Sequence, residues 1–111
     1  MIEKILLDHL SAALPVPVCM EVPEDPPGTF CLLEKTGGSE NDHICTAVVA
    51  VQSWARTLLE AAELNEQVKA AMRRAADRDE IAHVRLNTDY NFTDTSTRHY
   101  RYQAVFDLVH Y

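Results

Sequence analysis

Residues Ile44–Trp54 read ICTAVVAVQSW, an apolar run rich in valine. Valine and isoleucine favour a strand, because their branched side chains fit a pleated and partly buried surface. Apolar side chains occur at both alternating sets of positions around Val48–Val51, which indicates a strand that is covered on both faces. We therefore expect a central strand with helices on one face and a neighbouring subunit on the other.

The segments before this strand predict its first partners. Phe30–Thr36 predicts a strand that forms a hairpin with it, and the polar residues Gly37–Asp42 predict the connecting turn. Further upstream, Val16–Val22 is rich in β-forming residues, which predicts a first strand, and it ends at the proline-rich loop PEDPPG, Pro23–Gly28. Apolar side chains recur at helical spacing over residues 2–13, which predicts a helix there. His9 joins its apolar stripe, and we interpret it as a core or edge histidine.

The segments after the strand complete the fold. Thr57–Glu60, TLLE, has the pattern of a capping box, so a second helix should begin there and end near Asp77. Its predicted apolar stripe consists of Leu58, Ala61, Leu64, Val68, Met72 and Ala75.

Two alternating segments predict a last hairpin. In residues 81–92 the expected inner set is Val84, Leu86, Thr88 and Tyr90, and the outer set is His83, Arg85, Asn87 and Asp89. In residues 100–109 the two sets are Tyr100, Tyr102, Ala104, Phe106, Leu108 and Arg101, Gln103, Val105, Asp107, Val109. The expected fold is one α+β domain over residues 1–111, in the order α-β-β-β-α-β-β, with an antiparallel or mixed sheet and two helices on one face.

The charge distribution is strongly uneven. The chain of 111 residues has a formal net charge of -7, which argues against nucleic acid or an anionic membrane as the main partner. Residues 1–53 hold two basic and eight acidic side chains, whereas residues 54–111 hold eight basic and nine acidic ones. The first half is therefore the acidic half.

No pattern in the sequence predicts a reaction. Cys19, Cys31 and Cys45 lack the paired spacing of a zinc site, and we interpret them as small buried side chains in a protein of a reducing cytoplasm. The histidines and glutamates lack a positioned nucleophile, so we expect no enzyme, metal or cofactor. The aromatic side chains near the end of the chain are interpreted as core packing across the last hairpin. They are Tyr90, Phe92, Tyr100, Tyr102 and Phe106.

Four parts of the chain resemble the tail-terminator or tail-completion proteins of long-tailed bacteriophages and Gram-positive prophages. They are EVPEDPPGTF (Glu21–Phe30), EKTGG (Glu34–Gly38), LLEAAELNEQVKAAM (Leu58–Met72), and LNTDYNFTDT (Leu86–Thr95) with RYQAVFDLVHY (Arg101–Tyr111). The resemblance implies a ring, commonly a hexamer, that caps the tail tube, ends its growth and docks the head-to-tail connector protein. It implies no catalytic residues. It places the protein in the host cytoplasm during assembly and then in the virion tail.

A ring needs two different contact patches on each subunit, and the uneven charge could supply them. We expect acidic residues of one copy to meet basic residues of the next. The predicted interface consists of Glu24, Asp25, Glu40 and Asp42 against Arg85, Arg98 and Arg101. The alternative is a small α+β adaptor without catalysis that binds a protein partner as a monomer or dimer.

Overall fold

The computed structural model describes residues 1–96 and 99–111, and it is an α+β fold with the predicted order of elements. The elements are α1 (Ile2–Ala13), β1 (Val18–Cys19), β2 (Phe30–Asn41), β3 (Ile44–Ala55), α2 (Leu58–Ala75), β4 (Ile81–Asn91) and β5 (Tyr100–His110). The five strands form one sheet in the order β1-β2-β3-β5-β4. The sheet is mixed, because β1 runs parallel to β2 while the other neighbours are antiparallel.

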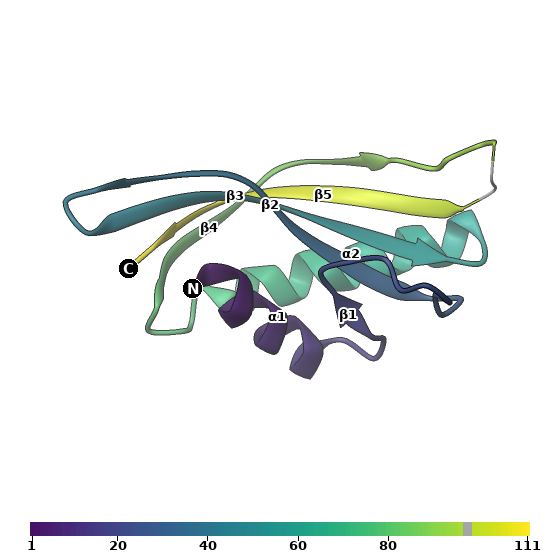
Figure 1. The fold of residues 1–111 in the computed structure, drawn as a ribbon, viewed down its shortest axis with the longest axis horizontal. Helices are drawn as coiled ribbons and strands as arrows, with labels where there is room; N and C mark the ends of the chain where they lie inside the picture. The colour runs from purple at the N-terminus through teal and green to yellow at the C-terminus, as the bar shows by residue number, and fades with distance from the viewer. Residues whose placement is uncertain (97–98) are drawn as a thin grey trace.

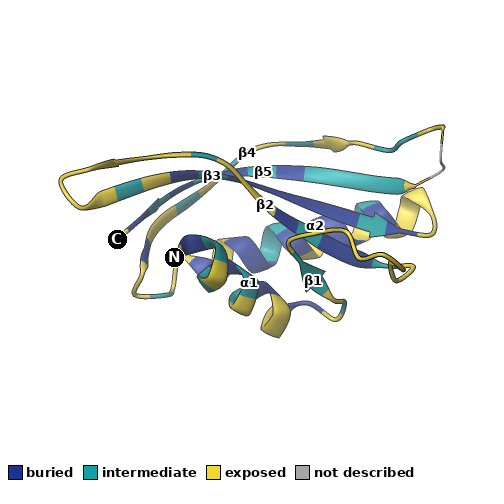
Figure 2. Ribbon diagram, in the orientation of Figure 1, coloured by how far each residue is buried: buried dark blue, intermediate teal, exposed yellow. Residues whose placement is uncertain are grey.

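Both helices lie on the same face of the sheet (Figure 1). α2 packs across β3, β5 and β4, and α1 packs beside α2 over β1 and β2. The core between the two layers contains Leu6 and Leu10 of α1, Val68 and Met72 of α2, and Phe106 of β5, all at most 1% exposed. In Figure 2 the buried residues accordingly follow the middle of the sheet and the inner sides of the helices.

The predicted helix over residues 2–13 is confirmed. His9 connects the two helices, because its Nε2 lies 2.8 Å from the carbonyl oxygen of Ala71 and its Nδ1 accepts a hydrogen bond from Arg78 Nε at 2.9 Å. This pattern requires a neutral imidazole with the proton on Nε2.

The predicted start of the second helix is also confirmed. The Thr57 hydroxyl accepts from the backbone N–H of Glu60 at 3.2 Å, and α2 ends at Ala75, close to the expected position. Leu58 was expected in the buried stripe, but it is 39% exposed. It is the first residue of the helix, where the chain has not yet reached the inner surface of the sheet.

Two of the predicted boundaries are wrong. The first strand covers only Val18–Cys19 instead of residues 16–22, since Pro17 has no N–H and contributes only a carbonyl, which accepts from Cys31 N at 2.9 Å. The predicted turn at residues 37–42 is mostly strand, because β2 continues to Asn41 and the reversal occurs at Asp42 and His43. These two residues have positive φ angles of 51° and 65°, as a tight two-residue hairpin requires.

The predicted alternation of the fourth strand holds only for its first half. β4 pairs with β5 through two bulges, one between Ile81 and His83 and one between Leu86 and Thr88. The second bulge inserts Asn87 without a partner, which reverses the faces of all the following residues. As a result, Asp89 lies on the helix side and Tyr90 on the opposite side, contrary to the prediction.

Candidate functional site

The face of the sheet opposite the helices is not covered by a helix in the described part of the chain (Figure 1). The pairing of the strands determines which side chains it carries, since alternate residues of β3 point to it. Ala50 and Gln52 lie on this open face and are only 3% and 8% exposed, because neighbouring side chains of the sheet cover them. The open face is thus a packed surface of mixed polarity.

One end of the open face carries a cluster around the single tryptophan. Trp54 stacks on Phe30 with ring centroids 5.1 Å apart. The guanidinium of Arg101 lies 4.9 Å from the Trp54 centroid and 4.7 Å from the Phe92 centroid, and its Nε donates to the Phe92 carbonyl at 2.7 Å. Arg101 is therefore held between two aromatic rings by cation–π contacts.

Two glutamines join the other side of this cluster. Trp54 Nε1 donates to Gln52 Oε1 at 3.0 Å, and Gln52 Nε2 donates to Gln103 Oε1 at 3.0 Å. Gln103 Nε2 in turn donates to the hydroxyl of Tyr90, whose ring meets Phe92 edge-on at 5.8 Å. We call this set the aromatic–amide cluster; it consists of Gln52, Trp54, Tyr90, Phe92, Arg101 and Gln103.

The aromatic–amide cluster is a closed circuit of contacts that draws on three strands, so its side chains are held in place before any partner arrives. Tyr90 and Phe92 are each 39% exposed, which contradicts their predicted role in the core. Tryptophan, tyrosine and arginine are the side chains most enriched at the energetic centres of protein interfaces. The cluster has the composition and rigidity of a protein-binding surface.

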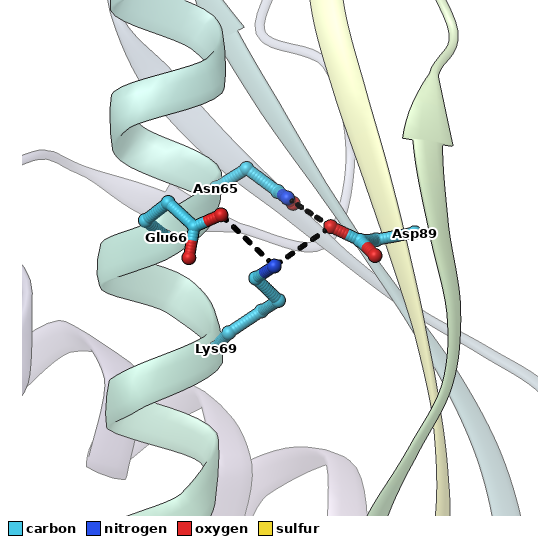
Figure 3. Close-up of polar contacts among 4 residues, drawn as sticks. All are labelled: Asn65, Glu66, Lys69 and Asp89. Atoms are coloured by element: carbon cyan, nitrogen blue, oxygen red, sulfur yellow. Dashed lines mark hydrogen bonds and ion pairs between the residues drawn. The ribbon is translucent and has the colours of Figure 1, made fainter.

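The helix side of β4 carries a polar clamp formed by Asn65, Lys69 and Asp89 (Figure 3). Asn65 Nδ2 and Lys69 Nζ both donate to Asp89 Oδ2 at 2.9 Å, and Lys69 also pairs with Glu66 at 3.0 Å. Asn65 is only 1% exposed. Because Asp89 reaches the helix only through the bulge at Asn87, the clamp fixes the bent second half of β4 against α2.

The charges of the clamp stabilise each other. The hydrogen bond from Lys69, helped by that from Asn65, lowers the pKa of the Asp89 carboxyl. The hydrogen bonds to Asp89 and Glu66 raise the pKa of Lys69. A carboxyl with a depressed folded-state pKa contributes stability above its unfolded pKa, and this contribution is lost as the pH falls through the folded value.

We therefore expect Asp89→Asn to lower the free energy of unfolding by about 1–2 kcal/mol at pH 7, since it removes a charge-assisted hydrogen bond. The difference between wild type and variant should shrink as the pH falls below the ordinary pKa of an aspartate. Urea denaturation at neutral and acidic pH measures both effects. Asp42→Asn, in the exposed hairpin turn, should be close to neutral throughout. A difference that stays constant or grows toward acidic pH would contradict the role of the clamp.

A shallow hollow of about 410 Å³ lies in the other half of the open face. Arg85 and Asp107 line it and form an ion pair at 2.9 Å, which Asn87 joins through a hydrogen bond to Asp107 at 3.0 Å. The hydrogen bond from Arg85, more than that from Asn87, lowers the pKa of Asp107. This pair satisfies the two charges within one chain.

The predicted interface residues do not come together in one subunit. Glu24 and Asp25 are exposed in the loop between β1 and β2, at the end of the sheet where Trp54 lies, while Glu40 and Asp42 are exposed at the opposite end, in the β2–β3 hairpin. Arg85 and Arg101 both have partners within the chain. Arg98 lies outside the described residues.

The sequence reasoning missed Gln52, Trp54 and Gln103 as members of a site. Their signal was present, because strand alternation places Gln52 and Trp54 on the same face as Val48, and Gln103 on the same face as Arg101. The strand pairing that aligns Gln52 with Gln103 was needed to connect them.

The cysteines Cys19 and Cys31 are predominantly protonated thiols. Burial raises the pKa of Cys31 to about 12 and also raises that of Cys19, so both thiols are protonated and weakly nucleophilic at neutral pH. Within the same ranges, no group of three or more histidine, cysteine, aspartate or glutamate side chains could hold a metal ion. In the β2–β3 ladder Cys31 lies opposite Ser53 and Cys45 lies opposite Glu40, so these two cysteines are not neighbours across the hairpin.

No protein-family profile matches the chain, and no curated protein matches it in sequence. Among the helices that the structure describes, none is long and apolar enough to cross a membrane.

Proposed function

We propose that this chain is a structural subunit that assembles with copies of itself into a ring, a hexamer as in the family that it resembles, and that the ring caps the tail tube of a long-tailed bacteriophage. The tube protein and the head-to-tail connector protein are its other partners, and it acts without catalysis. It assembles in the host cytoplasm and remains in the virion tail. The phage assignment rests on the sequence resemblance over residues 21–30, 34–38, 58–72, 86–95 and 101–111.

The observation that carries the assembly proposal is the aromatic–amide cluster on the open face of the sheet. Trp54 and Arg101 are held there by neighbours on both sides, yet no helix of the described chain covers them. A surface of this composition supports protein binding with little loss of side-chain entropy, because the side chains are already ordered. In the proposed assembly this surface faces the end of the tube, in place of the neighbouring subunit expected from the sequence.

The test is the length of tail tubes that polymerise with and without the chain, measured by negative-stain electron microscopy. The expected result is that added chain stops elongation and narrows the distribution of tube lengths. Phe92→Ser, on the open face, should weaken capping, whereas Leu59→Ser, an equally apolar change on α2, should leave it intact. Tubes that grow to the same lengths at saturating chain would exclude a terminator and favour the adaptor.

A further inference from the structure

Two strands of the sheet have an outer side without a partner strand in the described chain. β1 pairs only with Cys31 and Leu32, so β2 is an open edge from Leu33 to Asn41. β4 pairs with β5 on one side only and forms the opposite edge. Open edges present unpaired backbone N–H and C=O groups, which can pair with a strand of another chain.

The two edges match each other in direction and length. Three antiparallel steps separate β2 from β4, so the two strands run in opposite directions within one subunit. A copy placed beside the first by rotation about an axis along the strands keeps these directions. Its β2 therefore lies antiparallel to the β4 of its neighbour, and an antiparallel ladder can form. The free part of β2 and the strand β4 are both long enough for a substantial ladder.

The charge asymmetry of the sequence becomes a difference between these two sides of the sheet. Residues 1–43, which form α1, β1 and β2, hold two basic and eight acidic side chains, and the central strand β3 holds none. Residues 56–111, which form α2, β4 and β5, hold eight basic and nine acidic ones. The β2 side is therefore strongly acidic and the β4 side nearly neutral.

The same contrast is present at the edges themselves. The open part of β2 carries two exposed acidic residues, Glu34 and Glu40, and one exposed basic residue, Lys35, so it is acidic on balance. The two glutamates form no ion pair with a described residue. On the other side, Arg73 is exposed one helical turn after Lys69, on the flank of α2 that faces β4. Opposite charges on two different patches favour contact between unlike sides over contact between like sides.

The bulges bend both edges. β2 has an irregularity between Lys35 and Gly37, and β4 has the two bulges described above. A bulge increases the local bend and twist of a strand, and sheets that close on themselves use bulges to curve. The clamp of Asn65, Lys69 and Asp89 holds one of these bends in a fixed shape.

We propose that subunits join by antiparallel pairing of the β2 edge of one copy with the β4 edge of the next, so that their sheets become continuous. This inference rests on the proposed function, because it assumes that further copies of the chain bind at both edges. It differs from the predicted interface, because the contact is made by backbone ladders flanked by charges instead of by arginines that already have partners within the chain.

The test is chemical cross-linking between two marked edges. Ser39 on β2 and His83 on β4 lie level across the sheet, through Thr46 and Val109, and both are exposed. S39C and H83C are made separately in a chain that also carries C19S and C45S, with the buried Cys31 retained. The two proteins, one of them mass-labelled, are mixed and treated with a short bismaleimide. E34C with T88C, level through Ala50 and Val105, repeats the test at a second position along the two strands.

The expected result is a cross-linked dimer in each mixture, with the link mapped between β2 and β4 by mass spectrometry. Neither protein should give this link when it is treated alone. A mixture of S39C with E63C, on the exposed face of α2, is the matched control and should give no dimer. Light scattering on the same samples separates the two proposals. Closed oligomers without the β2–β4 link would overturn edge pairing and leave the ring standing. The link without tube capping would support edge pairing and reject the terminator function, and monomers without the link would overturn both.

Discussion

Deletion of Asn87 is expected to destabilise the fold by several kcal/mol. Asn87 is the unpaired residue of the second bulge in β4, so its loss shifts Thr88–Asn91 by one position and exchanges their faces. Asp89 would leave the helix side, so both Asn65 and Lys69 would lose the carboxylate to which they donate. Asn65 is only 1% exposed, so water cannot easily replace that partner. Tyr90 would turn from the open face toward α2.

The expected loss is about 2–4 kcal/mol in the free energy of unfolding, because the buried Asn65 amide is left without its partner and the partly exposed pair of Lys69 and Asp89 is broken. Urea denaturation followed by circular dichroism measures it. Asn87→Ala is the matched control, because it keeps the bulge and removes only the exposed hydrogen bond to Asp107, so its effect on stability should be small. Equal stability of the deletion and the alanine variant would show that the bulge does not determine the position of Asp89.

Trp54→Ala is the second substitution with a large expected effect. It removes the ring stacked on Phe30, the aromatic partner of Arg101 and the donor to Gln52. Because Trp54 is only partly buried, we expect a loss of about 2–3 kcal/mol, below the range for a fully buried tryptophan.

Trp54→Phe keeps a ring on Phe30 and should lose about 1 kcal/mol, mainly from the missing hydrogen bond to Gln52. Thermal and urea unfolding of the two variants, followed by circular dichroism, provides the comparison. If alanine and phenylalanine at position 54 were equally stable, the stacking on Phe30 would contribute nothing to the cluster.

The order of helices and strands could be predicted because each follows a local rule. The helical spacing of Ile2, Leu6 and Leu10 and the cap at Thr57 are properties of neighbouring residues, and the structure confirms both helices. The alternation of β5 is uninterrupted and was predicted correctly. The bulges of β4 were not predictable in this way. The alternation of side chains continues along the sequence without a break, and only the pairing with β5 shows that the residues after the bulge have changed faces.

The candidate surface was predictable only in part, for a related reason. Arg85 and Arg101 were selected by their charge alone. Their partners within the chain are not their neighbours in the sequence: Arg85 pairs with Asp107, and Arg101 contacts the rings of Trp54 and Phe92. The unequal charge of the two halves was visible in the sequence. That it separates the two edges of one sheet became visible only with the strand order.

The most direct test of the assembly is cryo-electron microscopy of tail-tube ends incubated with the chain. The account predicts a closed ring of this chain at the end of each tube, with density for β2 of one subunit running beside β4 of the next. Bare tube ends in the presence of excess folded chain would contradict it.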